Sequence, residues 1–264
     1  MKSVIYYFSG TGNSLDIARK ISTTLEAPTE IISIAHLYKA PDIQEHSDIV
    51  GFVFPNYLGD APWLVKEFVK KLNFSNTPYI YAVTTCNGHP KDCLAIFQAL
   101  LKTCSQTLAF AEVVLMPGNA KISSPEVNTK RLSASAETCL AIANKVNARV
   151  TEAITASQKL SERKILGSPR KKLDIVFSHF RVSAACNKCG TCRKICPMCN
   201  IKLQNGRPMW GNECATCLAC FHWCPKNAIT FWFPILGKRP RYRHPDISLK
   251  DMTMVASVTK TPDR

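Results

Sequence analysis

Two short runs of cysteines constrain this chain more than any other feature of its sequence. The first run reads CNKCGTCRKICP and spans residues 186–197, and the second reads CATCLACFHWCP and spans residues 214–225. Both follow the spacing C-x2-C-x2-C-x3-C-P, and they begin 28 residues apart. The cysteine-rich part is therefore an internal repeat, which we place at residues 182–231.

The thirteen cysteines of the chain indicate metal or redox chemistry rather than a disulfide framework. The first residues, MKSVIYYFSGTGNS, have too short an apolar run for a signal peptide. No apolar run approaches the roughly 18 residues that span a bilayer. We therefore expect a cytoplasmic protein without a transmembrane segment, in which thiols stay reduced.

The spacing within each run favours a [4Fe–4S] cluster over a zinc ion. Three cysteines so spaced can wrap one face of a cube, while the helix expected near the Pro carries the fourth cysteine away. Structural zinc sites usually pair two short C-x2–4-C knuckles or use histidines, a pattern that neither run follows. Each cube must then take its fourth thiolate from elsewhere in the chain.

The cysteine module resembles bacterial-type ferredoxin domains with two [4Fe–4S] clusters, in its spacing and in the aliphatic residues after each Pro, Ile201 and Ile229. In those ferredoxins the fourth cysteine of each run binds the other cluster. The resemblance therefore implies crossed ligand sets, one of Cys186, Cys189, Cys192 and Cys224, and one of Cys214, Cys217, Cys220 and Cys196. Cys199 is a ninth cysteine nearby, either an alternative ligand or a bystander thiol.

The positive charge of the chain is concentrated around and after the cysteine module. Residues 1–157 hold 14 Lys and Arg against 13 Asp and Glu, whereas residues 158–264 hold 20 against 6, a net charge of +14. Two oxidised clusters of about −2 each would leave this second part at roughly +10. Such a surface favours an acidic redox partner protein of the ferredoxin or flavodoxin type, or it serves only to keep the protein soluble. A nucleic-acid partner is the weakest alternative, because the basic residues form short clusters without a recognised reading module.

Residues 1–157 alternate between short apolar runs and helical periodicity. We expect strands at residues 4–8, 31–34, 49–54, 79–83 and 108–115, and helices at 13–26, 62–72, 90–101 and 131–156. This alternation is typical of right-handed β-α-β units, with a parallel sheet covered on both faces. The predicted fold class is α/β: a five-stranded, doubly wound parallel domain, followed by a small α+β cysteine domain.

The loop FSGTGNS, between the first expected strand and helix, is suited to binding a phosphate. Backbone N–H groups at a helix N-terminus, together with hydroxyl groups, form a phosphate site that needs no basic side chain. The loop has no Lys, which excludes a Walker A motif, and it lacks the full G-x-G-x-x-G spacing. It resembles the FMN-phosphate loop of flavodoxins, which implies that the phosphate is held by Ser9, Gly10, Thr11, Gly12, Asn13 and Ser14. The alternative is a Gly/Ser turn without a ligand.

Two later loops resemble those that border the flavin ring in flavodoxins. Ligands of a doubly wound fold bind beyond the carboxyl ends of the strands, where this chain reads FPNYLGDAPW and TTCNGHPKDC. The resemblance implies one border made of Pro55, Asn56, Tyr57, Leu58 and Gly59, and a second made of Thr84, Thr85, Cys86, Asn87 and Gly88. The peptide between Gly59 and Asp60 matches the Gly-Asp peptide that, in that family, can hydrogen-bond the reduced ring.

The same loops depart from flavodoxins in their aromatic residues. Flavodoxins usually cover the ring with a large side chain before the Gly-Asp, where this chain has Leu58. They also tend to place a Tyr in the second loop, where this chain has none. One face of the ring would thus be open to a hydride donor or a substrate. We interpret His89 as a solvated loop residue and Cys86 as a packing thiol.

As a whole, the chain resembles the fused flavodoxin–ferredoxin proteins of anaerobic bacteria and archaea. Its predicted parts are an FMN-binding domain at 1–157, a basic connector at 158–181, a two-cluster domain at 182–231 and a basic tail at 232–264. The resemblance implies electron transfer between FMN, two [4Fe–4S] clusters and an external redox partner. The alternative is an FMN-dependent reductase of a small-molecule acceptor. If the chain is an enzyme, it is an oxidoreductase, because no residue pattern indicates hydrolysis or nucleophilic catalysis.

Overall fold

The computed structural model describes residues 1–120, 123–157, 159–167, 180–231 and 240–253. These residues form two compact units. The first comprises residues 1–9, 13–118, 123–157 and 159–167, and the second comprises residues 10–12, 119–120, 180–231 and 240–253. Residues 158 and 168–179 of the predicted connector, and 232–239 and 254–264 of the predicted tail, lie outside the described residues.

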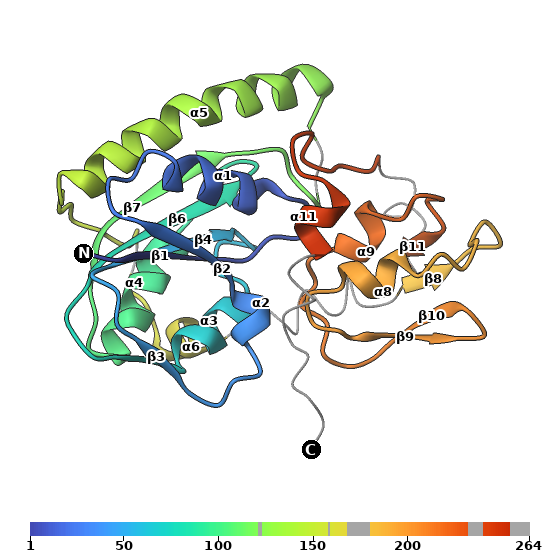
Figure 1. Ribbon diagram of the computed structural model, residues 1–264, viewed down its shortest axis with the longest axis horizontal. Helices are drawn as coiled ribbons and strands as arrows, with labels where there is room; N and C mark the ends of the chain where they lie inside the picture. The colour runs from blue at the N-terminus through green and yellow to red at the C-terminus, as the bar shows by residue number, and fades with distance from the viewer. Residues whose placement is uncertain (121–122, 158, 168–179, 232–239, 254–264) are drawn as a thin grey trace. The chain divides into compact units, whose positions relative to one another are not determined.

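A five-stranded parallel sheet forms the centre of the first unit (Figure 1). Its strands are β1 (Ser3–Tyr7), β2 (Thr29–Ser33), β4 (Ile49–Pro55), β6 (Tyr79–Cys86) and β7 (Leu108–Leu115). They pair in parallel in the order β2-β1-β4-β6-β7. Numbered along the chain this order is 2-1-3-4-5, the doubly wound arrangement of flavodoxin-like folds. The prediction of a five-stranded parallel domain is confirmed.

Helices cover both faces of this sheet, as parallel sheets require (Figure 1). One face carries α1 (Asn13–Ser22) and α5 (Pro125–Asn147), and the other carries α3 (Trp63–Val69) and α4 (Cys93–Thr103). Because it is covered on both sides, β1 is buried along its whole length. The rings of Phe52 and Phe54 in β4 pack against Phe97 in α4, with centroids 5.2 and 4.7 Å apart. This packing fixes β4 and the start of the loop that follows it.

The boundaries of two predicted helices are corrected by the structure. The helix expected at 131–156 starts earlier, because the hydroxyl of Ser124 caps it by accepting the N–H of Val127 and Pro125 occupies its first turn. It ends at Asn147. The helix expected at 62–72 stops early, because Leu72–Phe74 forms β5, which pairs in parallel with β3 (Ile43–Glu45). Two short helices, α2 (Ile34–Leu37) and α6 (Glu162–Leu166), complete the unit.

The second unit is small and mixes short strands with short helices. Its two antiparallel strand pairs are β8 (Phe180–Val182) with β11 (Ile229–Phe231), and β9 (Ile201–Gln204) with β10 (Arg207–Trp210). Its helices are α8 (Thr191–Ile195), α9 (Ala219–His222) and α11 (Leu249–Thr253). This is the predicted α+β composition; the likeness to a ferredoxin domain stays a prediction.

The 28-residue sequence repeat recurs in the backbone of this unit. Three pairs of positions at that spacing have left-handed φ angles: Lys188 and Thr216 (61° and 52°), Gly190 and Leu218 (74° and 60°), and Cys199 and Asn227 (51° and 50°). In the first half, α8 begins directly after Gly190. In the second half, α9 begins directly after the equivalent residue, Leu218. Each half therefore consists of a left-handed turn, a short helix and a Cys-Pro turn.

In the part of the chain that the structure describes, no helix has both the length and the apolar composition needed to cross a membrane.

Candidate functional site

A cavity in the second unit brings together four cysteines from both runs. Its lining includes Cys186, Cys189 and Cys192 of the first run and Cys224 of the second. Three residues of the first run thus share one cavity with the last cysteine of the other, which is the combination that the crossed ligand sets require. Their role as iron ligands stays a prediction.

The thiols of this cavity differ in exposure and in acidity. Cys189 is exposed, and the pKa of its thiol is lowered by Thr191, whose hydroxyl lies 3.3 Å from the sulfur. Cys192 is buried, and burial raises the pKa of its thiol to about 11, with the charges of Cys224 and Cys189 acting in the same direction. A bound metal would offset this cost, since it holds thiols in their deprotonated form. The cavity therefore has one edge open to solvent, at Cys189.

The remaining four predicted ligands are Cys196, Cys214, Cys217 and Cys220. Cys217 and Cys220 are buried, and burial is the main cause that raises the pKa of both thiols. The charges of Cys196 and Cys214 raise both values further. That these four thiols form one ligand set stays a prediction. This set is more enclosed than the first.

A backbone N–H group donates to the sulfur atom of the fourth cysteine in each run. The N–H of Asn200 lies 3.4 Å from Cys196 Sγ, and that of Ala228 lies 3.3 Å from Cys224 Sγ. The two bonds occupy equivalent positions of the 28-residue repeat. Both halves of the repeat therefore place a backbone donor at the same sulfur position.

The exposed ninth cysteine, Cys199, is a turn residue. Its N–H donates to the carbonyl of Cys196 at 3.1 Å, and its equivalent in the second half, Asn227, makes the same bond to Cys224. The second half therefore forms this turn without a thiol, which favours the bystander interpretation of Cys199.

The predicted phosphate loop follows β1 and leads into α1. Ser9, Asn13 and Ser14 belong to the first unit and are buried, as is Thr11. Gly10, Thr11 and Gly12 are grouped with the second unit, and Gly12 has a φ of 102°, which favours glycine. This split between units was not expected from the sequence.

Two residues of the phosphate loop reach the carboxyl ends of neighbouring strands. The Asn13 side-chain amide donates to the carbonyl of Pro117, beyond β7, at 2.7 Å. The Ser14 and Thr85 hydroxyl groups lie 3.1 Å apart, which links the loop to the end of β6. The structure therefore brings the end of the phosphate loop to one of the two loops predicted to border a flavin ring.

The first ring loop, residues 55–59, ends in a tight two-residue turn. Tyr57 and Asp60 exchange backbone hydrogen bonds of 2.8 and 3.1 Å. Leu58 and Gly59 between them have φ angles of 58° and 90°, as in a type I′ turn. Leu58 is the exposed tip, at 61% exposure, while Tyr57 is buried. The turn therefore presents an aliphatic side chain rather than an aromatic ring.

Asn56 joins the two ring loops. Its backbone N–H donates to the carbonyl of Thr85 at 2.9 Å, and its side-chain amide donates to the carbonyl of Pro90 at 2.7 Å. Its side-chain oxygen accepts the N–H of Gly59 at 2.8 Å. Residues 55–59 and 84–88 are therefore adjacent, as the resemblance implies.

The second ring loop is held by an arginine that sequence reasoning missed. Arg131, in α5, donates to the backbone carbonyl of Asn87 at 2.8 Å and to the hydroxyl of Ser123 at 3.0 Å, and it also contacts the Asn87 side-chain oxygen. Cys86 in this loop donates to the carbonyl of Gly88, and burial raises the pKa of its thiol. A raised pKa makes a thiol a poor nucleophile, which agrees with a packing role for Cys86.

His89 is an exposed loop residue. The hydrogen bond described for its ring is local: Nδ1 accepts the N–H of Lys91 at 2.9 Å. This bond holds the turn after Gly88 and agrees with the interpretation of His89 as a loop residue.

A buried ion pair that was not predicted from the sequence joins the residue after the first ring loop, Asp60, to Lys66. Lys66 of α3 is 1% exposed, and its Nζ lies 3.0 Å from Oδ2 of Asp60. Burial lowers the pKa of Lys66, while the charge of Asp60 acts in the opposite direction. Asp60 also accepts the N–H of Ala61 at 2.8 Å. The pair ties the tight turn at Leu58 and Gly59 to helix α3.

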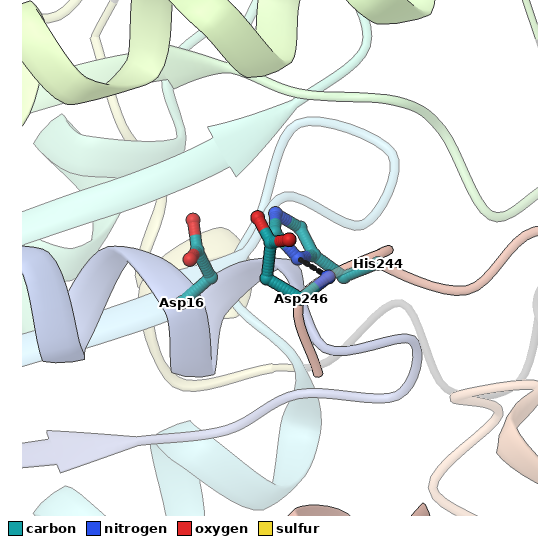
Figure 2. A group of neighbouring side chains, drawn as sticks. All are labelled: Asp16, His244 and Asp246. Atoms are coloured by element: carbon teal, nitrogen blue, oxygen red, sulfur yellow. Dashed lines mark hydrogen bonds between the residues drawn. The ribbon is translucent and has the colours of Figure 1, made fainter. Parts of the chain in front are cut away.

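Figure 2 shows three further polar side chains, those of Asp16, His244 and Asp246. In the segment 240–253, the N–H of Asp246 donates to Nδ1 of His244 at 3.2 Å, which places the proton of a neutral imidazole on Nε2. In α1, the carboxylate of Asp16 pairs with Lys20 one turn later at 2.7 Å. The first bond closes a turn around Pro245, and the second is a helical i,i+4 pair.

No family model matches the chain, and no curated protein matches it. Among solved structures, an FMN-dependent NADH-azoreductase from Bacillus anthracis in complex with FMN is similar to 56% of this chain over 100% of its own length (8% identity, TM-score 0.39). The two-electron reduced flavodoxin of Megasphaera elsdenii is similar to 52% of this chain over 98% of its own (17% identity, TM-score 0.35). A WrbA-like flavodoxin from Agrobacterium tumefaciens is similar to 55% of this chain over 98% of its own (17% identity, TM-score 0.32). These values are too low to assign a cofactor or an activity to this chain.

Proposed function

We propose that this chain is an electron-transfer protein that binds FMN at the carboxyl ends of its parallel strands and two [4Fe–4S] clusters in its cysteine module. The observation that carries the proposal is the cavity lined by Cys186, Cys189, Cys192 and Cys224. Four thiols from two distant runs suit a cube whose fourth ligand comes from the other half of a repeat. The second cluster would be held by Cys214, Cys217, Cys220 and Cys196.

The FMN part of the proposal is supported by where the loops lie on the sheet. Ligands of doubly wound sheets bind at the carboxyl ends of the strands. The contacts of Ser14 with Thr85 and of Asn56 with Thr85 bring the phosphate loop and both ring loops to that end. Ser9–Ser14 would hold the phosphate, and residues 55–59 and 84–88 would border the ring.

The two kinds of cofactor have complementary chemistry. FMN accepts electrons singly or as a pair with a proton, whereas each [4Fe–4S] cluster accepts one at a time. Joining both in one chain raises their effective concentration, so that transfer between them does not depend on the encounter of two proteins. A chain with thirteen cysteines, eight of which we propose to bind iron, suits a reducing, cytoplasmic location.

The partner we propose is an acidic redox protein of the ferredoxin or flavodoxin type. Residues 180–231 hold seven Lys and Arg, all exposed, against one acidic residue, Glu213. Four of the cations line the cysteine cavity or directly follow a residue that does: Lys188, Arg193, Arg207 and Lys226. Cys189, which is exposed, opens the same cavity to solvent. An acidic partner would be steered to this rim.

Charge reversal at the rim should slow electron exchange in a salt-dependent way. We expect Lys188→Glu to lower the second-order rate constant for oxidation of a reduced acidic ferredoxin about tenfold at low ionic strength. The difference should shrink as salt screens the charges. Stopped-flow absorbance measures the rate. Lys202→Glu is the matched control, because it makes the same charge change on β9 outside the cavity lining. Equal slowing by both variants would contradict docking at the rim.

A second candidate function is reduction of a small-molecule acceptor by FMN fed from the clusters. It is favoured by one observation, the exposed Leu58 at the tip of the first ring loop with Tyr57 buried behind it. No aromatic side chain of this turn would then cover the ring. Saturable multiple turnover of a quinone or nitro compound would favour this function over that of a carrier.

The composition of the purified protein tests the proposal directly. Isolated without oxygen, the chain should carry one FMN and about eight irons, four for each cube. Metal analysis, flavin release and the visible absorption spectrum measure this. Stoichiometric zinc in place of iron, or a chain that binds no flavin on reconstitution, would overturn it.

A further inference from the structure

Arg241, in the segment that follows the cysteine module, makes close contacts with the second cysteine run. Its guanidinium carbon lies 3.3 Å from the centroid of the Phe221 ring, which follows Cys220 in α9. This stacking uses the planar face of the guanidinium. Its edge remains available to donate hydrogen bonds.

The edge of the same guanidinium donates to three backbone carbonyl groups. Nη2 donates to Ile229 at 2.6 Å and to Asn227 at 3.1 Å, and Nη1 donates to Phe221. The three acceptors lie on both sides of Cys224 in the sequence. One side chain therefore closes the segment 221–229 into a loop, using a fork of donors that Lys does not possess.

Arg241 contacts the chain beside one cysteine of each predicted ligand set, because Phe221 directly follows Cys220 and Cys224 lies within the segment 221–229. Burial lowers the pKa of Arg241, and the charges of Cys224 and Cys220 act in the opposite direction. An arginine remains protonated at any ordinary pH. Cys224 belongs to the set with Cys186, and Cys220 to the set with Cys214. Arg241 is thus held next to one cysteine of each predicted set.

We propose that Arg241 is a positioning residue that raises the reduction potentials of both clusters. It fixes the loop that contains Cys224, and it places one positive charge close to Cys220 and Cys224, one cysteine of each predicted ligand set. This inference rests on the proposed function. Each cluster gains one negative charge when it is reduced, and a fixed cation nearby stabilises that reduced form. Because the guanidinium is half-buried, solvent screens this interaction less than it would at an exposed side chain.

The test is a potential titration of the anaerobically purified holoprotein, followed by visible absorbance and electron paramagnetic resonance. In Arg241→Gln, the ratio of reduced to oxidised cluster at a fixed potential should fall about tenfold, which corresponds to about 59 mV for a one-electron couple. Arg243→Gln is the matched control, because it removes the same charge from an exposed side chain two residues away. It should leave the ratio close to that of the wild type.

The conservative variant separates charge from loop geometry. Arg241→Lys keeps the cation but loses the three-carbonyl fork, so we expect it to keep most of the potential while lowering the thermal stability of the loop. If Arg241→Gln does not retain iron, the potentials of Arg241→Lys are compared with those of the wild type instead. Unchanged potentials in Arg241→Gln with about eight irons bound would overturn the inference, as would a fall in Arg241→Lys as large as that in Arg241→Gln. A wild-type chain without iron would instead overturn the proposed function.

Discussion

Replacing Cys196 with alanine is expected to halve the iron content, from about eight irons for each chain to about four. Cys196 lies in the first run, but its charge acts on Cys217 and Cys220 of the second. The iron lost should therefore belong to the Cys214 site, and the cavity lined by Cys186 and Cys224 should keep its cluster. Colorimetric iron analysis of anaerobically purified protein measures the change.

Double variants decide whether the ligand sets are crossed. With crossed sets, Cys196→Ala combined with Cys214→Ala damages a single site and leaves about four irons, whereas Cys196→Ala combined with Cys186→Ala damages both and leaves none. If each run bound its own cluster, the two results would be exchanged. The control is Cys199→Ala, which removes an exposed thiol three residues away and should keep about eight irons, because its equivalent is Asn227.

The local part of the cysteine site could be predicted because it depends on spacing alone. Two runs with the same spacing at a 28-residue interval imply two copies of one backbone path, and the left-handed positions recur at that interval, even at Leu218 where the first half has Gly190. The pairing of Cys224 with the first run is not a local property. It came from the resemblance to two-cluster ferredoxins, and the shared cavity agrees with it.

The parallel sheet was predictable for a related reason. Strands buried on both faces are apolar without interruption, and the helices between them show a period of 3.6 residues. The short strand β5 was not predicted, because its first residue, Leu72, continues the apolar pattern of the preceding helix. Ser124 and Pro125 marked the true start of α5, a signal that the long Ala-rich stretch after them obscured.

The residues that support the ring loops could not be found from the sequence. Arg131 lies 44 residues from Asn87, and nothing in the composition of α5 distinguishes it from an exposed basic residue. Lys66 lies in the expected helix 62–72, where a lysine next to apolar positions is typical of a solvated face, yet it is 1% exposed. Such contacts depend on how the chain packs in three dimensions, which no local pattern records.

The buried pair of Lys66 and Asp60 gives the second large expected effect. Lys66→Met should lower the free energy of unfolding by about 3–5 kcal/mol, because it leaves the Asp60 carboxylate buried without its cation. The exposed pair of Lys70 and Glu67, at 2.7 Å in the same region of the chain, supplies the matched control. Lys70→Met should cost less than about 1 kcal/mol, since exposed pairs contribute little. Urea unfolding of the full-length apoprotein, followed by circular dichroism, compares the two.

If the turn at Leu58 and Gly59 borders FMN as proposed, the same substitution should weaken FMN binding, because Asp60 closes that turn. We expect the dissociation constant of FMN to rise at least tenfold in Lys66→Met and to change little in Lys70→Met, as measured by quenching of flavin fluorescence. Replacing both partners, as Asp60→Asn with Lys66→Met, should recover part of the lost stability, because no uncompensated charge stays buried. If Lys66→Met proved no less stable than Lys70→Met, the ion pair would not hold the loop. If stability fell while FMN affinity stayed unchanged, the turn at Leu58 and Gly59 would not border the flavin.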